Sequence, residues 1–432
     1  NSFGLVSNAY LSMAGATAAR VRRSSADTSK GAMAMATSAE QMRSWKGFAI
    51  LTYGFRPFFL GSAVFAALAM AAWVPMLAGR LSLPTAFDPV SWHAHEFLFG
   101  YLGAVIAGFL LTAVPNWTGR LPLVGWPLAG LFTLWLSGRI VIAVSAGLPA
   151  SLVAAVDLAF QVALAGAILR ELVAGRNWRN LVVLGMLTLM ILGNLLFHLD
   201  AARGNYAAQG AGLRLGLAAA VLMIAVIGGR IVPSFTRNWL VKRGETRLPS
   251  PLGRFDKIAL AILLAALALW VAMPEGVPTG FALMVAGALH AFRLSRWAGA
   301  STGAEPLVWI LHAGYGFVPA GALALGMAIL FPEMLGTAAA QHLWLAGAIG
   351  VMTLAVMTRA TLGHTGRTLA AGPGTALVYL LLICSVLMRV LAGLSPAQAE
   401  MLYVLSALTW IAAFSGFALL YGPLLACHRK AA

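Results

Sequence analysis

The hydrophobic pattern of the chain is a series of long apolar stretches separated by short polar segments. Twelve stretches reach about 18 residues, the length that marks an α-helix able to cross the hydrocarbon of a bilayer. Gly and Ala recur within them, as is typical of helices that pack closely in lipid. The pattern therefore predicts twelve transmembrane helices, at residues 54–79, 92–114, 126–147, 150–173, 179–201, 211–233, 256–274, 277–298, 305–331, 338–360, 373–394 and 401–426.

The composition agrees with an all-α integral membrane protein. Apolar residues make up 60% of the 432 residues and charged residues 10%, whereas a soluble domain is nearer half apolar and a quarter charged. Charged side chains are thus too few to cover a water-facing surface, which excludes a soluble globule or a disordered chain. A β-barrel would show short alternating segments instead of long apolar stretches, and the pattern disfavours it.

Two polar tails are predicted to flank the membrane domain. Residues 1–47 are rich in Ser and Ala, and we expect a mobile cytoplasmic tail, with an amphipathic surface helix as the alternative. This segment lacks a long apolar region, so no cleavable signal peptide is expected. Residues 48–426 form the twelve-helix transmembrane domain, and residues 427–432 form a short cytoplasmic tail.

The placement of the basic residues predicts the topology. The formal net charge is +16, which in a soluble protein would suggest an anionic partner such as nucleic acid. If the helices alternate in direction, the two termini and the even-numbered loops share one side, and all but five of the 29 Lys and Arg residues lie there. Because basic residues collect on the cytoplasmic side, both termini are predicted to be cytoplasmic. The positive charge then requires no nucleic acid.

An internal repeat relates the second and tenth predicted helices. Residues 95–120 and 342–367 both begin with His and end in Thr-Gly-Arg, with identical Leu, Gly and Ala positions between them. The sixth helix ends in Val-Pro-Ser-Phe-Thr at 232–236, which is similar to Val-Pro-Asn-Trp-Thr at 114–118. These matches predict three pseudo-symmetric units of four helices. The alternative is chance similarity between helices that are all rich in Gly and Ala.

Four histidines are expected at the outer ends of the helices: His93, His95, His198 and His342. Ionisable residues within a membrane are costly and often functional, and imidazoles ligate haem iron or copper. His95 and His342 occupy equivalent repeat positions, so we predict that they face each other as axial haem ligands. His93 points away from His95 on a regular helix, which leaves His93 and His198 for a second metal or a further haem. A lone histidine at a membrane edge is more often only a hydrogen-bonded interfacial residue.

The cytoplasmic ends of the helices carry weaker candidates. His312 and His364 end adjacent, oppositely directed helices and could approach each other at a second cofactor; otherwise they are hydrogen-bonded helix-end residues. Arg230 and Arg359 occupy equivalent repeat positions and could pair with a haem propionate or a substrate anion, although anchoring of the helix ends is the favoured interpretation. Glu96 could orient an imidazole or simply complement a helix dipole.

Sequence motifs narrow the chemistry further. The chain contains no Walker motif, no GxGxxG dinucleotide turn, no GxSxG elbow and no CxxCH haem-attachment motif. Any haem is therefore predicted to be held non-covalently, as one or more b haems. Nucleotide-driven transport by this chain is not expected.

Several motifs, in order along the chain, resemble the NnrS family: residues 92–96 (WHAHE), 108–119 (GFLLTAVPNWTG), 229–237 (GRIVPSFTR) and 357–367 (MTRATLGHTGR). The resemblance covers about residues 48–426. It implies a bacterial cytoplasmic (inner) membrane protein with twelve spans that contains haem and copper and is linked to denitrification and to relief from nitric oxide stress. It also implies functional roles for six histidines, without assigning each to haem or copper: His93, His95, His198, His312, His342 and His364.

A more distant similarity is to the catalytic subunit of haem–copper oxidases and nitric oxide reductases. The number of helices and the histidines on the second and tenth helices fit that arrangement. Here, however, the sixth helix has no histidine, and the His-x-His pair lies on the second helix. A three-histidine copper centre opposite a haem is therefore not evident in this sequence, and fold-level analogy is weak evidence for function.

The leading hypothesis is a haem-containing membrane redox protein, with copper as a second cofactor, that binds or reduces nitric oxide and relieves nitrosative stress. Catalytic residues, the electron donor and the oligomeric state stay open. One alternative is a multi-pass transporter, for which Asp157 would be the mid-span acid. Another is a gas or metal sensor, or an assembly factor, without turnover. The expected partners are nitric oxide and the lipid bilayer.

Overall fold

The computed structural model describes residues 45–120 and 122–427. Residues 1–44 of the predicted N-terminal tail and residues 428–432 of the predicted C-terminal tail lie outside this part. Within it, twelve helices are long and apolar enough to cross a membrane, and no strand occurs. The prediction of an all-α fold with twelve spans is thus confirmed.

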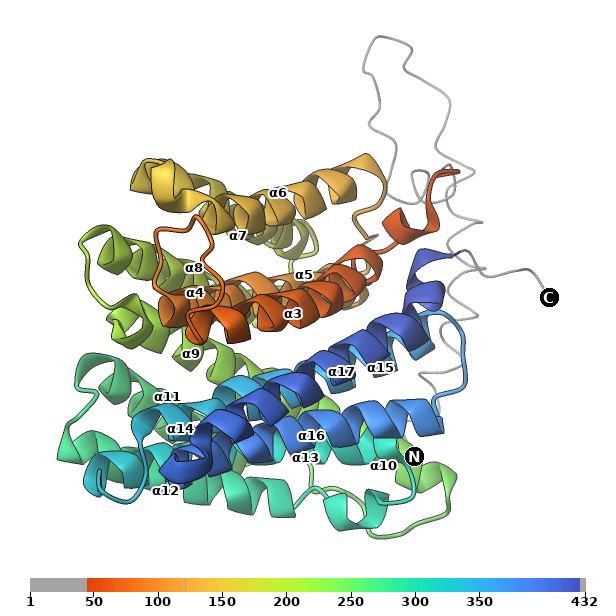
Figure 1. Cartoon of the computed structure of the whole chain (residues 1–432). Coiled ribbons are helices and arrows are strands. Elements are labelled where there is room, and N and C mark those ends of the chain that lie inside the picture. The colour runs from red at the N-terminus through yellow and green to blue at the C-terminus, as the bar shows by residue number, and fades with distance from the viewer. Residues whose placement is uncertain (1–44, 121, 428–432) are drawn as a thin grey trace. The chain divides into compact units, whose positions relative to one another are not determined.

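The helices run side by side in a bundle (Figure 1). Nine spans are simple α-helices. The first six in chain order are α3 (Phe55–Leu77), α6 (Trp126–Ala143), α7 (Ala150–Ala174), α8 (Leu181–Ala202), α11 (Arg254–Ala272) and α12 (Val277–Ser295). Three more complete the set of simple spans: α13 (Pro306–Leu330), α16 (Pro373–Leu394) and α17 (Ala399–Ala426). Short 3₁₀ turns join some of them: η2 (Ala49–Leu51), η4 (Ser145–Gly147), η5 (Trp178–Asn180), η6 (Ala207–Gln209), η8 (Gly299–Thr302) and η10 (Pro396–Gln398).

The second, sixth and tenth spans are composite helices, each interrupted by a wider π-helical segment. The second joins α4 (Pro89–His95), η3 (Glu96–Tyr101) and α5 (Leu102–Thr118). The sixth joins α9 (Ala211–Met223), η7 (Ile224–Gly228) and α10 (Gly229–Lys242), and the tenth joins α14 (Thr337–His342), η9 (Leu343–Val351) and α15 (Met352–His364). Because π-helical segments are rare and frequent at functional sites, these three helices hold the most interest.

These three composite helices also form the interior of the bundle. In the second, sixth and tenth spans, 78%, 61% and 72% of the most apolar stretch is buried, against at most 50% in the other spans. They are the helices that the internal repeat relates, and a π-helical segment in each of them agrees with that repeat. The three-unit symmetry itself stays a prediction.

The composite helices are longer than their apolar stretches predicted. The second span continues to Thr118 and the tenth to His364, because polar side chains near a membrane surface end a hydropathy stretch without ending the helix. The second span ends directly before the Gly of its Thr-Gly-Arg sequence, and the tenth ends two residues before the Gly of its own. Gly119 (φ 69°) and Gly366 (φ 68°) adopt the left-handed conformation that favours glycine after a helix.

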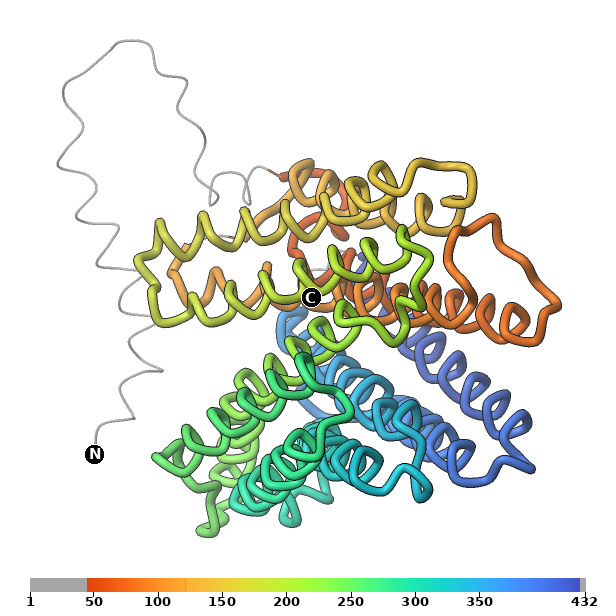
Figure 2. The backbone as a smooth tube through the Cα atoms, turned by 90° about the vertical axis from the view of Figure 1, so that its left-hand side faces the viewer, coloured from red at the N-terminus to blue at the C-terminus, as the bar shows by residue number. Residues whose placement is uncertain are grey.

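The first and last spans are neighbours. Helix α3 packs along α17, and the guanidinium of Arg56 donates hydrogen bonds to the carbonyls of Leu425 and Cys427 at 3.0 Å each. Figure 2 shows the two ends of the coloured chain approaching each other in this way. The start of the first span and the end of the last therefore lie at the same end of the bundle. We call this the His364 end, and the opposite end, where α4 begins, the His93 end.

Candidate functional site

Two histidines on α4 project to opposite sides of the helix. Asp88 caps this helix, because its Oδ1 accepts hydrogen bonds from the backbone amides of Val90 and Ser91 at 3.0 and 2.9 Å. His93 and His95 are two residues apart and thus about 200° apart around the helix. His95 is fully buried and faces α7 and α8, whereas the half-buried His93 faces α14. The pair therefore serves two separate sites.

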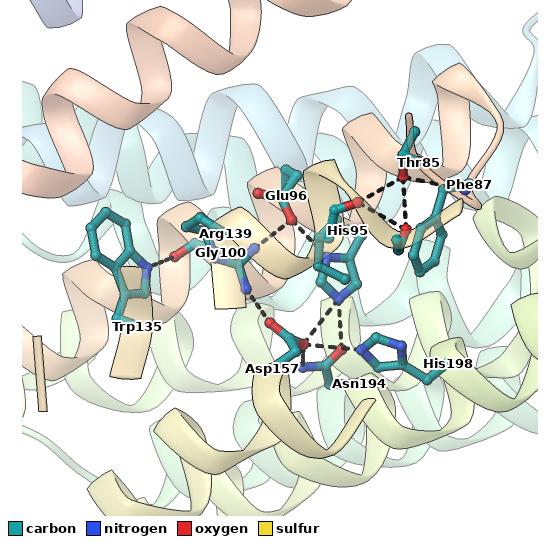
Figure 3. Close-up of polar contacts among 12 residues, drawn as sticks. Thr85, Phe87, His95, Glu96, Gly100, Trp135, Arg139, Asp157, Asn194 and His198 are labelled. Carbon is teal, nitrogen blue, oxygen red and sulfur yellow. Dashed lines mark hydrogen bonds and ion pairs between the residues drawn. The ribbon is translucent and has the colours of Figure 1, made fainter. Parts of the chain in front are cut away.

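The first site is a buried polar cluster between the second, third, fourth and fifth spans (Figure 3). No member is more than 7% exposed, and phenylalanine rings, including that of Phe87, pack around the imidazole of His95. Each side chain in the cluster is therefore shielded from water and depends on its neighbours for polar contacts. This His95 cluster consists of His95, Glu96, Arg139, Asp157, Asn194 and His198.

Asp157 on α7 is the centre of the cluster. Its Oδ2 accepts a hydrogen bond from Asn194 Nδ2 at 2.7 Å and lies 3.1 Å from His198 Nε2. The same oxygen lies 3.2 Å from His95 Nε2, and Oδ1 pairs with the guanidinium of Arg139. Asn194 and His198 are four residues apart and so share one face of α8. One carboxylate thus joins its own span to three others.

Charge is not balanced within the cluster. The Arg139 guanidinium bridges Asp157 and Glu96, and its Nη1 lies 2.5 Å from Glu96 Oε1. Two carboxylates and one guanidinium leave one negative charge, which is costly in a buried site. Both ring nitrogens of His95 face oxygen atoms, with Nδ1 3.0 Å from Glu96 and Nε2 3.0 Å from Asn194 Oδ1. The cluster therefore calls for an additional positive charge, either a proton or a bound cation.

Three members of the cluster have the donor atoms of a metal site. One ligand atom each from His95, Asp157 and His198 can be chosen so that all lie within 4.8 Å of one another. Two imidazole nitrogens and a carboxylate oxygen suit transition metals such as copper, zinc or iron. A monovalent ion bound there would also neutralise the cluster. The donor set and the charge thus both fit a cation.

The second site is a cavity at the His93 end, with a volume of about 170 Å³. His93 on α4 and His342 at the end of α14 lie on its walls, with Arg389 of α16 beside them. Tyr206, between the fifth and sixth spans, also lines it. Partial burial, reinforced by the negative charge of Asp88, raises the pKa of the Tyr206 hydroxyl, and this group is a hydrogen-bond donor at neutral pH, as an ordinary tyrosine is.

His93 and His342 are neighbours on the wall of this cavity, with nearly parallel rings. Their centroids are 6.5 Å apart and their planes differ by 10°. Two imidazoles that ligate one metal at about 2 Å per bond would place their centroids roughly 6 Å apart. His93 is held from behind by Trp73, with ring centroids 4.1 Å apart. The spacing therefore fits a metal or haem iron between the two histidines.

Hydrogen bonding leaves ligand atoms available in this cavity. The Nδ1 of His342 lies 2.7 Å from the carbonyl of Ala338, and an Nδ1–H in that contact leaves Nε2 unprotonated for a metal. His93 Nδ1 and Arg389 Nε are buried, and neither has a hydrogen-bond partner among the residues that the structure describes. An arginine at this position suits an anionic group such as a haem propionate. The residues present thus fit a b haem.

The structure therefore pairs the outer histidines differently from the sequence prediction. His342 lies opposite His93 and not opposite His95, and His198 lies beside His95 and not beside His93. The reason is the opposite direction of the two α4 side chains, because only one of them can face α14. All four predicted residues nevertheless lie in one of two sites at the same end of the bundle.

The predicted cytoplasmic residues lie in three different surroundings. His364 is exposed and lines a cavity of about 350 Å³ at the His364 end together with Arg359, whose guanidinium lies 4.1 Å from the centroid of the Phe235 ring. His312 instead is buried, and its Nε2 lies 2.7 Å from the hydroxyl of Thr236. Arg230 is exposed and contacts Asn180 at 3.4 Å. Of the four residues predicted at the cytoplasmic ends, His364 and Arg359 line the cavity at the His364 end, and the other two do not.

Sequence reasoning did not place Arg139, Asn194 or Arg389 in a site. A signal existed for Arg139, because a basic residue within one span and Asp157 within the next are joined by a short loop, which is typical of an intramembrane ion pair. Asn194 precedes His198 by four residues and so shares its helix face. Nothing in the sequence pattern distinguishes Arg389 from a helix-end anchor.

The fold and both sites define a multi-pass α-helical membrane protein with buried histidine-rich sites at one end. Residues 49–429 match the family model described as NnrS protein. The chain therefore belongs to the NnrS family, a family of membrane proteins linked to the nitric oxide response. No curated protein gives a significant match.

Proposed function

We propose that this protein is a haem- and copper-containing redox protein of the bacterial cytoplasmic membrane that binds or reduces nitric oxide and so relieves nitrosative stress. Both termini are proposed to be cytoplasmic, which places the His93 end at the outer face. The observation that carries the proposal is that His93 and His342 line one cavity at a separation that suits ligation of one iron.

In this proposal, His93 and His342 hold a b haem and Arg389 neutralises one of its propionates. When bound, the haem would supply an iron that changes its oxidation state and that accepts a diatomic gas once one of the two histidines releases it. The residues of the cavity would orient the two histidines and offer a hydrogen bond. The Ala338 carbonyl orients the His342 ring, Trp73 positions the His93 ring, and the Tyr206 hydroxyl offers a hydrogen bond at the wall.

The His95 cluster is proposed to hold the copper. His95, Asp157 and His198 would be its ligands, while Glu96 and Arg139 set their orientation and charge. The cluster lies on the opposite side of α4 from the haem cavity, so one helix would connect the two centres.

A second b haem is proposed for the cavity at the His364 end. His364 would ligate it and Arg359 would pair with a propionate. His312 is excluded from this proposal because Thr236 holds it elsewhere. Reduction of two nitric oxide molecules to nitrous oxide and water consumes two electrons and two protons, and a second haem would bring electrons from the cytoplasmic side.

The test is metal and haem quantification of the purified protein, with visible spectra before and after anaerobic addition of nitric oxide. We expect a b-haem spectrum, about one copper per chain, and a spectral shift with nitric oxide. Consumption of nitric oxide under reducing conditions would establish turnover. A colourless, metal-free protein would contradict the proposal and favour a transporter, and haem without consumption would favour a sensor.

A further inference from the structure

The three composite helices leave a cavity between them in the middle of the bundle. It has a volume of about 70 Å³, enough for roughly two water-sized molecules at about 30 Å³ each. Its walls come from α5, from α9, η7 and α10, and from α15. Of the described residues that line it, none is charged, and Thr353 carries the one polar side chain. The cavity is therefore suited to small uncharged molecules and not to ions.

This middle cavity adjoins the cavities at both ends of the bundle. Phe109, Ile231 and Val356 line both the middle cavity and the cavity at the His364 end. Towards the other end, Tyr101 lines the cavity of His93 and His342. Its hydroxyl lies 2.6 Å from that of Thr353, which lines the middle cavity. This pair of hydroxyl groups thus lies between the apolar space and the cavity of the two histidines.

The hydroxyl pair has a defined direction. Thr353 Oγ1 lies 2.7 Å from the carbonyl of Ile349 and 2.9 Å from that of Gly350, and it donates to these carbonyls. It therefore accepts its hydrogen bond from Tyr101. Both carbonyls belong to the π-helical segment η9, and contacts to carbonyls three and four residues earlier are usual for a threonine in a helix. Carbonyl groups of the π-helical segment η9 thus fix the position of the Tyr101–Thr353 hydroxyl pair.

The middle cavity also reaches the surface of the bundle. Ile224, Ile227 and Ile231 line it and are half-buried, so they are partly in contact with the surroundings. At mid-span these surroundings are the hydrocarbon of the bilayer, where uncharged diatomic gases concentrate. Charged solutes and hydrated ions do not enter this region.

We propose that the middle cavity is the inlet through which an uncharged diatomic gas passes from the bilayer to the cavity of His93 and His342, with the Tyr101–Thr353 hydroxyl pair as its narrowest point. The destination of the gas rests on the proposed function, but the cavity and its lining do not. The same arrangement keeps water and protons from crossing the middle of the bundle, because its lining offers them no chain of polar groups.

Xenon binding tests the cavity without any cofactor, because xenon occupies apolar cavities of this kind. We expect xenon between the three composite helices in crystals or grids of the wild-type protein prepared under xenon pressure. Ile227→Trp should abolish this site by filling it. The matched control, Ile258→Trp, changes a 55% exposed isoleucine of α11 and should retain it. Absence of xenon from the wild type, or a lipid acyl chain in its place, would overturn the inference.

Gas-binding kinetics test the passage itself. After flash photolysis of carbon monoxide from the reduced, haem-loaded protein, Ile227→Trp should slow bimolecular recombination about tenfold. Tyr101→Phe removes the hydroxyl pair and should accelerate recombination, while Ile258→Trp should leave it unchanged. A recombination rate in Ile227→Trp equal to that of the wild type would contradict the passage. Absence of haem from the protein would instead contradict the proposed function, and the xenon experiment would still decide the inlet.

Discussion

At the scale of single residues, the two histidines of α4 show how a spacing of two residues separates two functions. His93 faces the cavity and His342, whereas His95 is enclosed with Asp157 and His198. A sequence pattern reveals both histidines, but which one faces α14 depends on the rotation of the helix in the bundle. Packing around α4 decides that rotation, and no local signal reports it.

The pairing predicts distinct losses in three alanine variants. His93→Ala and His342→Ala should both lose most of the Soret absorbance per protein, because each removes a residue proposed to hold the haem. His95→Ala should keep the Soret band and lose bound copper. The measurement is a visible spectrum together with metal analysis, and His290→Ala, which removes a buried histidine that contacts Tyr315 and Ala259, is the control. Loss of the Soret band in His95→Ala with retention in His93→Ala would restore the pairing predicted from the repeat.

Arg139 supplies the positive charge that faces Glu96 and Asp157 in the His95 cluster. Arg139→Gln leaves Glu96 and Asp157 buried without their counter-charge, and we expect a loss of stability of about 3–5 kcal/mol. The double variant Arg139→Gln with Glu96→Gln restores the original net charge and should recover part of that loss. Thermal unfolding in detergent measures both. Equal stability of the single and double variants would show that charge is not what Arg139 contributes.

At the scale of elements, the three π-helical segments are what hydropathy analysis could not detect. Apolar stretches located all twelve spans, because membrane helices must bury their backbone polar groups and present apolar side chains to lipid. A π-helical turn changes the backbone hydrogen bonding without changing composition, so the sequence of 343–351 carries no evident signal for it. The same applies to the longer ends of the composite helices, where polar side chains hide a continuing helix.

Close packing at η3 makes Gly100 a sensitive position. A methyl group there would contact the guanidinium of Arg139, so Gly100→Ala should displace Arg139 and lower the unfolding temperature. Gly130 on α6 is the matched control, because a methyl group there meets open space. Gly130→Ala should be neutral or stabilising by about 0.5–1 kcal/mol, since alanine favours a helix over glycine. Differential scanning fluorimetry of the two variants distinguishes these outcomes, and identical unfolding temperatures would contradict the predicted contact.

At the scale of the whole molecule, α3 packs against α17, and the start of the first span and the end of the last lie at the same end of the bundle. The positive charge of the loops predicts that this end is cytoplasmic. The structure shows that the start of α3 and the end of α17 share one end of the bundle. The charge of the loops alone predicts on which side of the membrane that end lies.

Thiol labelling tests that orientation. Cys427 is exposed at the end of α17 and Cys384 is half-buried within α16. A membrane-impermeant thiol reagent should label Cys427 in inverted membrane vesicles and not in spheroplasts, and Cys427→Ser should remove the labelling. Arg80→Cys in the Cys427→Ser background, placed in the loop at the opposite end, should give the reverse pattern. Labelling of Cys427 from the outside would overturn the predicted topology.

The position of the two sites along the chain has a consequence for how the protein matures. Every member of the His95 cluster lies between residues 95 and 198, so the cluster is complete once α8 has been synthesised and inserted. The cavity of His93 and His342 also needs α14 and α16, which leave the ribosome much later. A metal ion proposed for the cluster could therefore bind during translation, whereas the proposed haem would have to be inserted after nearly the whole chain has been made.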